Sequence, residues 1–120
     1  MLKPILLVED NPRDLDLSLR ALARTNLANE VVVARDGEEA WNYLARQGPH
    51  ASRPRGNPAV VLLDLKLPKL NGVEVLDRIR QHPEMEQLPV VMLTASREQT
   101  DVARSYALGV NAYVVKPLGF

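Results

Sequence analysis

The chain contains no cysteine, no excess charge of either sign and no long hydrophobic run. Without cysteine there are no disulfide bonds and no thiolate metal sites, a composition compatible with a reducing cytoplasm. Fifteen basic and fifteen acidic side chains cancel, so no bulk attraction draws the chain to nucleic acid or to an anionic membrane. The apolar stretch after Pro4 is closed by acids after four residues, which suits neither a signal peptide nor a membrane span. We therefore expect a cytoplasmic protein that binds neither nucleic acid nor membrane.

Length and composition are those of one globular domain. The 120 residues are 46% hydrophobic and 25% charged, which is ordinary for a globular protein and sufficient for a real core. No internal repeat is visible. We expect a single domain over residues 1–120.

Five short apolar runs predict the strands of a sheet. They lie near residues 4–9, 30–35, 59–64, 89–94 and 111–115. The runs are rich in β-branched residues and do not alternate with polar ones, as is typical of parallel strands buried on both faces. The second run is the most polar and is expected at an edge of the sheet.

The segments between these runs carry helical spacing and helix-start signals. The predicted starts are Asn11 with Pro12, Asp36 with Glu39, Asn71 with Glu74, and Ser96 with Gln99. The residues expected to face the core are Leu15, Leu19, Leu22, Ala40, Trp41, Leu44, Val75, Leu76, Ile79, Val102, Ala103, Tyr106 and Ala107. Gly109 is expected just beyond the end of the fourth helix. Alternating strands and helices predict an α/β fold, a doubly wound five-stranded parallel sheet of strand order 2-1-3-4-5.

Polar side chains follow the apolar runs at corresponding points. Glu9 and Asp10 close the first run, Asp64 the third, Thr94 the fourth and Lys116 the fifth. Ligands of doubly wound sheets bind at the carboxyl ends of the strands, and in this strand order the first and third strands are neighbours. The three acids would then face one another, which is costly unless a cation offsets their repulsion. Oxygen ligands of this kind suit Mg²⁺ or Mn²⁺.

This set of groups supports phosphoryl chemistry. A carboxylate beside a metal ion and a lysine can attack phosphorus and form an aspartyl phosphate. The metal ion and the ammonium of Lys116 would offset charge on the transferring group, and the Thr94 hydroxyl would donate to one of its oxygens.

Four segments carry a resemblance to a known family. They are Leu7-Val8-Glu9-Asp10-Asn11, Leu63-Asp64-Leu65-Lys66-Leu67-Pro68 followed by Asn71-Gly72, Leu93-Thr94-Ala95, and Tyr113-Val114-Val115-Lys116-Pro117. Each segment is weak alone, but their order and spacing across nearly the whole chain are specific. The chain resembles a response-regulator receiver domain of bacterial two-component signalling, which has a flavodoxin-like fold. Its extended loop before the third strand is similar to that of stand-alone receivers paired with phytochrome-type kinases.

The resemblance implies a phosphoacceptor and a metal site. Asp64 corresponds to the phosphoacceptor, and Asp10 and Asp64 correspond to the carboxylates that bind Mg²⁺ or Mn²⁺. Glu9 corresponds to the second acid, which often reaches the metal through water. Lys66 corresponds to the residue whose backbone carbonyl completes the metal site, so its side chain is free to vary.

The resemblance also implies a switch. Thr94 corresponds to the switch hydroxyl, and Lys116 to the lysine that binds the phosphoryl group. Tyr113 corresponds to the aromatic residue that moves between exposed and buried rotamers. The peptide bond between Lys116 and Pro117 is expected to be cis, which would aim the lysine inward.

The implied function is a phosphorylation-driven switch and not an enzyme. A sensor histidine kinase, with the phytochrome type as the candidate, would pass a phosphoryl group to Asp64 with Mg²⁺. Autophosphorylation and autodephosphorylation at Asp64 would be the only reactions of the domain itself. Phosphorylation would remodel the surface of the fourth helix and fifth strand, and output would be homodimerisation or contact with a partner protein through that surface.

The end of the chain departs from the family pattern. Receivers normally have a fifth helix after the lysine and proline, and the chain ends four residues after Lys116. We therefore expect a receiver domain that lacks its last helix. Deletion, disorder and replacement by another chain are all open explanations.

Two other functions are open at this point. An aspartyl-phosphate hydrolase of the haloacid-dehalogenase type needs an acid two residues after its nucleophile, where this chain has Lys66. A flavodoxin-like flavin-binding module needs a hydroxyl- and glycine-rich phosphate loop after the first strand, where the segment from Glu9 to Pro12 is acidic.

Single residues also have plainer interpretations. Asp10 alone is explained as a helix cap, and Tyr113 alone as a core residue. His50 and His82 are expected to be solvated side chains. The loop at 47–58 is either a tolerated surface insertion or a contact for a partner.

Overall fold

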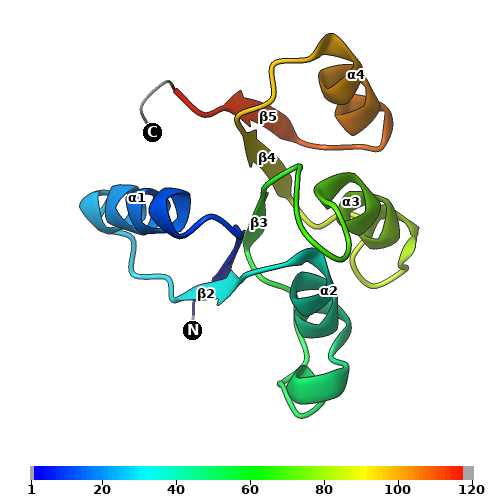
Figure 1. The fold of residues 1–120 in the computed structure, drawn as a ribbon. Helices are drawn as coiled ribbons and strands as arrows, with labels where there is room; N and C mark the ends of the chain where they lie inside the picture. The colour runs from blue at the N-terminus through cyan, green and yellow to red at the C-terminus, as the bar shows by residue number, and fades with distance from the viewer. Residues whose placement is uncertain (1, 118–120) are drawn as a thin grey trace.

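The computed structural model describes residues 2–117, in which strands and helices alternate along the chain (Figure 1). The strands are β1 (Ile5–Val8), β2 (Val31–Ala34), β3 (Val60–Leu63), β4 (Val90–Thr94) and β5 (Ala112–Val115). The helices are α1 (Pro12–Arg24), α2 (Gly37–Ala45), α3 (Gly72–Gln81) and α4 (Gln99–Ala107), with a short 3₁₀ helix at Gly48–His50. All the predicted strands are present, each shorter than predicted by one residue at one or both ends. Within the described residues, every helix is too short or too polar to span a bilayer.

The strands form one parallel sheet in the order β2-β1-β3-β4-β5. Ile5 of β1 is in register with Val31 on one side and with Val60 on the other. This arrangement confirms the predicted doubly wound fold and places β2 at an edge. The strand order reverses between β1 and β3, so their carboxyl ends flank the position where such sheets bind ligands.

The main core lies on the face of the sheet that α2, α3 and α4 cover, while α1 packs on the other face (Figure 1). Val75, Leu76 and Ile79 of α3 are 0% exposed, as predicted. The sheet residues in the same buried cluster are Leu6, Val8, Ala34, Val61, Leu63, Val90 and Met92. Burying side chains of this size contributes roughly 1.5–3 kcal/mol each, so this face is the main source of hydrophobic stabilisation.

The opposite face of the sheet is less covered. Leu15, Leu19 and Leu22 of α1 have the predicted helical spacing but are only half-buried. Val114 of β5 is 46% exposed. The predicted absence of a fifth helix concerns the chain after residue 117 and lies outside the described residues.

Three helices start as predicted. Side-chain oxygens of Asn11, Asp36 and Asn71 each accept the backbone N–H of the residue three positions on, which satisfies a donor that a helix leaves unpaired. The capping box of α3 is complete. In α2 the Glu39 carboxylate instead accepts from the N–H of Arg35, one residue before the cap.

The fourth helix starts later than predicted. It begins at Gln99 after Glu98, whose side chain makes no capping hydrogen bond. The Ser96 hydroxyl, which was expected to cap the helix, donates to the Asp101 carboxylate and accepts from the Glu98 N–H. The predicted capping box of Ser96 and Gln99 is therefore wrong, because the serine lies outside the helix and binds its first turn from there.

The buried face of α4 also differs from its prediction. Ser105 is 0% exposed, whereas Tyr106 is 51% exposed, and Ala103 and Ala107 are exposed too. The Ser105 hydroxyl donates to the backbone carbonyl of Asp101 at 2.8 Å, which removes the cost of burying it. The spacing of apolar residues therefore gave a wrong prediction for α4, because the inward position is taken by a serine whose hydroxyl is hydrogen-bonded.

The long loop between α2 and β3 is held in place by Arg53. Its guanidinium donates to the backbone carbonyls of Tyr43, Leu44 and Gly56. It also lies 4.3 Å from the centre of the Tyr43 ring, a favourable position for a cation. The half-buried side chain of Arg53 therefore connects the loop to the end of α2.

Both histidines pack against aromatic rings. His50 meets Tyr43 edge-on with ring centres 5.3 Å apart, and His82 meets Trp41 in the same way at 6.2 Å. Each histidine is half-buried. The expectation that they are simply solvated is therefore wrong, because aromatic edge-to-face packing competes with hydration.

Candidate functional site

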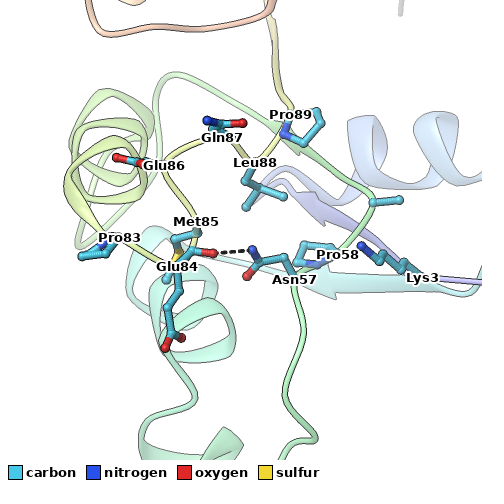
Figure 2. Close-up of a pocket in the computed structure, with 11 residues that line it drawn as sticks. Lys3, Asn57, Pro58, Pro83, Glu84, Met85, Glu86, Gln87, Leu88 and Pro89 are labelled. Atoms are coloured by element: carbon cyan, nitrogen blue, oxygen red, sulfur yellow. Dashed lines mark hydrogen bonds between the residues drawn. The ribbon is translucent and has the colours of Figure 1, made fainter.

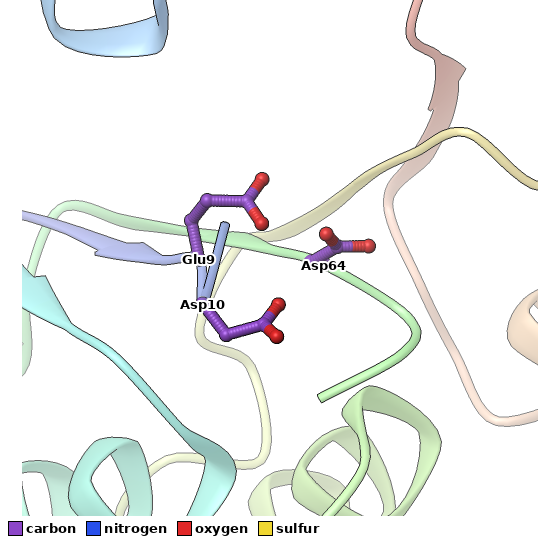
Figure 3. Close-up of side chains that lie close together, drawn as sticks. All are labelled: Glu9, Asp10 and Asp64. Atoms are coloured by element: carbon purple, nitrogen blue, oxygen red, sulfur yellow. The ribbon is translucent and has the colours of Figure 1, made fainter. Parts of the chain in front are cut away.

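Three carboxylates meet where β1 and β3 end (Figure 3). Val8 and Leu63 are paired in register, so the residues that follow them, Glu9 and Asp64, lie side by side. Figure 3 shows the side chains of Glu9 and Asp10 extending toward the space beside Asp64. One oxygen from each of the three lies within 4.8 Å of the others. The prediction that these acids converge is confirmed.

The ammonium of Lys116, the residue directly after β5, lies beside these carboxylates. Its side chain is 4% exposed, and it donates to Glu9, to Asp64 Oδ2 at 3.1 Å and to Asp14 Oδ2 at 3.0 Å. The backbone N–H of Lys116 donates to the Thr94 carbonyl at 2.7 Å, which extends the sheet hydrogen bonding to this residue. The lysine therefore points into the site, as predicted.

Burial and crowding perturb the titration of Glu9 and Lys116. Burial raises the pKa of the Glu9 carboxyl from 4.5 to about 7; Lys116 opposes this shift and Asp64 adds to it. Burial alone would lower the pKa of Lys116, but hydrogen bonds to Glu9 and Asp14 and the charge of Asp64 raise it. The ammonium is therefore held in its charged form beside the acids.

The donor set fits a hard divalent cation. Glu9 and Asp64 are buried, whereas Asp10 is exposed. A cavity of about 310 Å³ opens at the acids, and its lining residues are Glu9, Asp10, Asn11, Asp14, Asp64, Lys66, Thr94, Ala95, Ser96 and Lys116. Carboxylate oxygens that face water on one side suit Mg²⁺ and Mn²⁺, because Mg²⁺ keeps several water ligands.

Gly72 lets the loop after β3 fold tightly against the backbone of Asp64. A Cβ atom at this position would lie 2.1 Å from the Asp64 carbonyl oxygen. The N–H of Gly72 donates to the carbonyl of Leu65 at 2.7 Å. The turn thus fixes the backbone that follows Asp64, while the role expected for the Lys66 carbonyl stays a prediction.

Ser96 links the two predicted switch residues. Thr94 is 2% exposed, and its hydroxyl accepts from the Ser96 N–H at 3.3 Å. The Tyr113 hydroxyl donates to the Ser96 carbonyl at 3.0 Å. Burial raises the pKa of Tyr113, with the hydrogen bond to Ser96 opposing the shift. Sequence reasoning used Ser96 only as a helix cap and missed this link.

The peptide bond before Pro117 differs from the prediction. None of the peptide bonds between described residues is cis, so the prediction of a cis bond between Lys116 and Pro117 is wrong. The trans form is the favoured one for any peptide bond. The lysine points inward without it, because its N–H is fixed by Thr94 and its ammonium is fixed by carboxylates.

Asp14 is a site residue that sequence reasoning missed. It lies three residues after the Asn11 cap, where an acid is readily explained by the partial positive charge of a helix start. The structure shows instead that its carboxylate binds Lys116. The only sequence signal was a further acid one helical turn beyond Asp10, on the helix that leaves the site.

A larger hollow lies elsewhere. A cavity of about 520 Å³ lies where β1, β3 and β4 begin, lined by Lys3, Asn57–Ala59 and Pro83–Pro89. Figure 2 shows these lining residues. The Asn57 side-chain amide donates to the Glu84 carbonyl there at 2.8 Å. This cavity lies at the amino ends of the strands, opposite the carboxyl ends that carry the acids, so the chemistry of the lining residues and not cavity size identifies the candidate site.

Residues 5–120 match the family model of the response regulator receiver domain. Response regulator Rcp1 of Synechocystis sp. is 44% identical over 114 residues, which cover 95% of this chain and 76% of that protein.

Solved structures of similar proteins share the fold. The bacteriophytochrome response regulator RtBRR is 62% identical with a TM-score of 0.91, covering 98% of this chain and 71% of that one. The Mn²⁺-bound form of Rcp1 is 42% identical with a TM-score of 0.91, covering 98% and 84%. The phosphorylated cyanobacterial phytochrome response regulator RcpA is 44% identical with a TM-score of 0.91, covering 99% and 84%.

Proposed function

The chain belongs to the response regulator receiver domain family, and we propose that Asp64 is the residue that accepts the phosphoryl group. The observation that carries this proposal is the position of Asp64. Its carboxylate follows β3 directly, accepts a hydrogen bond from Lys116 and lies within the acid cluster of Glu9 and Asp10. A carboxylate held beside a buried ammonium at the edge of an open cavity is placed to act as a nucleophile.

The proposed reaction at Asp64 is a phosphoryl transfer. One carboxylate oxygen forms a bond to phosphorus, the bond from phosphorus to the donor atom breaks, and its electron pair leaves with the donor. The ammonium of Lys116 offsets charge on the transferring oxygens, and Thr94 lines the same cavity. Autodephosphorylation follows when water attacks the phosphorus, releasing inorganic phosphate and restoring the carboxylate. These are the only reactions proposed for the domain, which acts as a signalling switch.

A divalent cation, Mg²⁺ or Mn²⁺, is proposed to bind through Asp10, Asp64 and the Lys66 carbonyl, with Glu9 reaching it through water. The oxygen-only donor set supports this choice, as does the Mn²⁺-bound form of the relative Rcp1. When bound, the cation would withdraw charge from the phosphoryl oxygens.

The proposed switch acts through Ser96. Movement of the Thr94 hydroxyl toward a phosphoryl oxygen would disturb its hydrogen bond with the Ser96 N–H, and Tyr113 is bound to the carbonyl of the same serine. Ser96 also binds Asp101 in the first turn of α4. A change at Thr94 would therefore reach the surface formed by α4 and β5, through which we propose homodimerisation or contact with a partner protein.

The proposed phosphodonor is a sensor histidine kinase of the phytochrome type. Receiver domains are phosphorylated by histidine kinases, and two of the similar structures, RtBRR and RcpA, are named as phytochrome response regulators. The cytoplasmic location expected from the sequence stays a prediction.

Neither alternative function is supported. The position two residues after Asp64 is Lys66, which cannot serve as the general acid of a haloacid-dehalogenase-type hydrolase. The segment after β1 places Glu9 and Asp10 where a flavin phosphate would bind, and these acids would repel it.

The test is phosphorylation by acetyl phosphate in the presence of Mg²⁺, followed by intact-protein mass measurement. Wild type should gain the mass of one phosphoryl group, and Asp64→Asn should not. Asp77→Asn, which removes a half-buried acid of α3 away from the cavity, is the matched control and should be labelled like wild type. Unchanged mass in all three proteins would refute the proposal, and labelling of Asp64→Asn would place the acceptor elsewhere.

A further inference from the structure

Asp14 is the acid of this site that lies outside the carboxylate cluster. Its Oδ2 accepts from the Lys116 ammonium at 3.0 Å. Its backbone N–H is fixed by the Asn11 side chain, and its other oxygen lies 4.0 Å from Arg13 Nη1. The Asp14 side chain is 20% exposed against 4% for Lys116, so it stands at the mouth of the cavity and reaches inward to the lysine.

Among the described residues, the carboxylates that accept from Lys116 include Glu9, Asp64 and Asp14. Glu9 and Asp64 belong to the group that could hold a cation, and Asp14 does not. A bound cation would draw on the oxygens of Glu9 and Asp64. Asp14 lies outside that group and would still accept from Lys116 with the cation bound.

The charge of a bound cation also favours a contact between Lys116 and Asp14. A divalent cation at the acid cluster would repel the ammonium of Lys116, because like charges close together in a partly buried site disfavour each other. The ammonium therefore needs an anion of its own. Asp14 supplies one from α1, an element that is separate from the ends of β1 and β3, where the proposed metal ligands lie.

We propose that Asp14 is a positioning residue for phosphoryl transfer, which holds the ammonium of Lys116 beside Asp64 while the metal is bound. This inference rests on the proposed function of Asp64. The plainer explanation is that an acid in the first turn favours α1 through the helix dipole. The two explanations differ in whether Asp14 acts through Lys116.

The first test compares Asp14→Ala and Asp14→Asn with a control, Asp16→Ala. Asp16 lies in the same helix, is 58% exposed and pairs with Arg20 at 3.0 Å, so its removal takes the same charge from α1 without touching the cavity. We expect phosphorylation by acetyl phosphate at saturating Mg²⁺ to slow about tenfold in Asp14→Ala, as for one lost hydrogen bond between charged groups. Asp14→Asn keeps an oxygen acceptor and should slow less, and Asp16→Ala should match wild type. If Asp14→Ala does not fold, Asp14→Asn decides alone.

A double-mutant cycle with Lys116→Ala tests whether Asp14 acts on phosphorylation through Lys116. Once Lys116 is absent, Asp14→Ala should cause no further slowing, because its effect passes through the lysine. Equal slowing with and without Lys116 would overturn the inference and leave only a local effect on α1.

A third measurement needs no reaction. Hydrogen exchange of the Lys116 ammonium, followed by ¹⁵N NMR in protein saturated with Mg²⁺, should accelerate in Asp14→Ala and stay unchanged in Asp16→Ala. Unchanged exchange in Asp14→Ala would contradict a positioning role. If wild type itself takes up no phosphoryl group, the proposed function fails. If wild type reacts and Asp14→Ala reacts equally fast, the inference alone fails.

Discussion

Tyr113 and Ser96 are joined by a hydrogen bond of 3.0 Å from the tyrosine hydroxyl to the serine carbonyl. The N–H of the same serine donates to the Thr94 hydroxyl. A single residue therefore connects the buried hydroxyl at the end of β4 with the ring on β5. Its position between the cavity and α4 makes it the structural link on which the proposed switch depends.

Removing the Tyr113 hydroxyl should weaken this link without changing the chemistry. Tyr113→Phe should lower the free energy of unfolding by about 1 kcal/mol, the typical loss for one hydrogen bond. Phosphorylation of Asp64 should continue at the wild-type rate, since Tyr113 does not line the cavity. Urea unfolding measures the loss of stability, and mass measurement over time follows the phosphorylation rate. Tyr106→Phe, at a side chain 51% exposed, is the control and should not affect stability.

Gly72 should tolerate no side chain. A Cβ would lie 2.1 Å from the Asp64 carbonyl oxygen, so Gly72→Ala should push the loop away from β3, lower the unfolding free energy by roughly 1–3 kcal/mol and weaken Mg²⁺ binding. The matched control is Gly56→Ala, where φ is +121° but no atom lies within 4 Å of the new Cβ. That variant should lose some stability through backbone strain and keep its Mg²⁺ affinity. Equal Mg²⁺ affinities in the two variants would contradict the role given to Gly72.

The metal-free protein should become less stable as pH rises, through Glu9. The pKa of this carboxyl is about 7 in the folded protein against an ordinary 4.5, so the folded state holds the proton more tightly than the unfolded chain. The unfolding free energy therefore falls with rising pH between these two values, by at most about 3 kcal/mol from this group.

Urea unfolding in the presence of a chelator, for wild type and Glu9→Gln across the same pH window, isolates this contribution. The difference in stability between the two proteins should change with pH in the stated direction. A difference that does not vary with pH would show that Glu9 has an ordinary pKa. Mg²⁺ affinity of wild type should rise over the same window, because the cation must displace the proton.

The loop between α2 and β3 should depend on Arg53 and not on its neighbour Arg55. Arg53→Ala removes hydrogen bonds to backbone carbonyls and the contact with Tyr43, and should lower the unfolding free energy by roughly 1–3 kcal/mol. Arg55→Ala removes only a surface ion pair of 3.9 Å with Glu84, at a side chain 79% exposed, and should cost well under about 1 kcal/mol. Thermal or urea unfolding compares them. Similar losses would mean that the loop is not held by Arg53.

Strands and most helix starts were predictable because their signals are local. The apolar runs that became β1 to β5 are short, rich in β-branched residues and close in the sequence to helix-start signals, and Asn11 and Asn71 cap helices through their own side chains. Asp64 was predictable for the same reason, since a lone charge at the end of an apolar run must lie where the strand leaves the core.

Where the predictions were wrong, burial was set by a neighbour distant in sequence or by a polar group that had found a hydrogen-bond partner. Ser105 became the buried residue of α4 because its hydroxyl bonds to the preceding turn. His82 became half-buried because Trp41 lies beside it. Neither outcome is visible in apolar spacing, which counts hydrophobic side chains and ignores what a polar one can bind.

The order of residues sets which chemical groups stand at the strand ends: two acids after β1, one after β3, a hydroxyl at the end of β4 and a lysine after β5. Which of these groups meet depends on the packing of the folded chain. Lys116 binds Asp14 across a separation of 102 residues, and Ser96 joins Thr94 to Tyr113. A residue's type fixes what it can donate or accept, but its partner is set by how the helices and strands pack, and that depends on contacts spread over the whole chain.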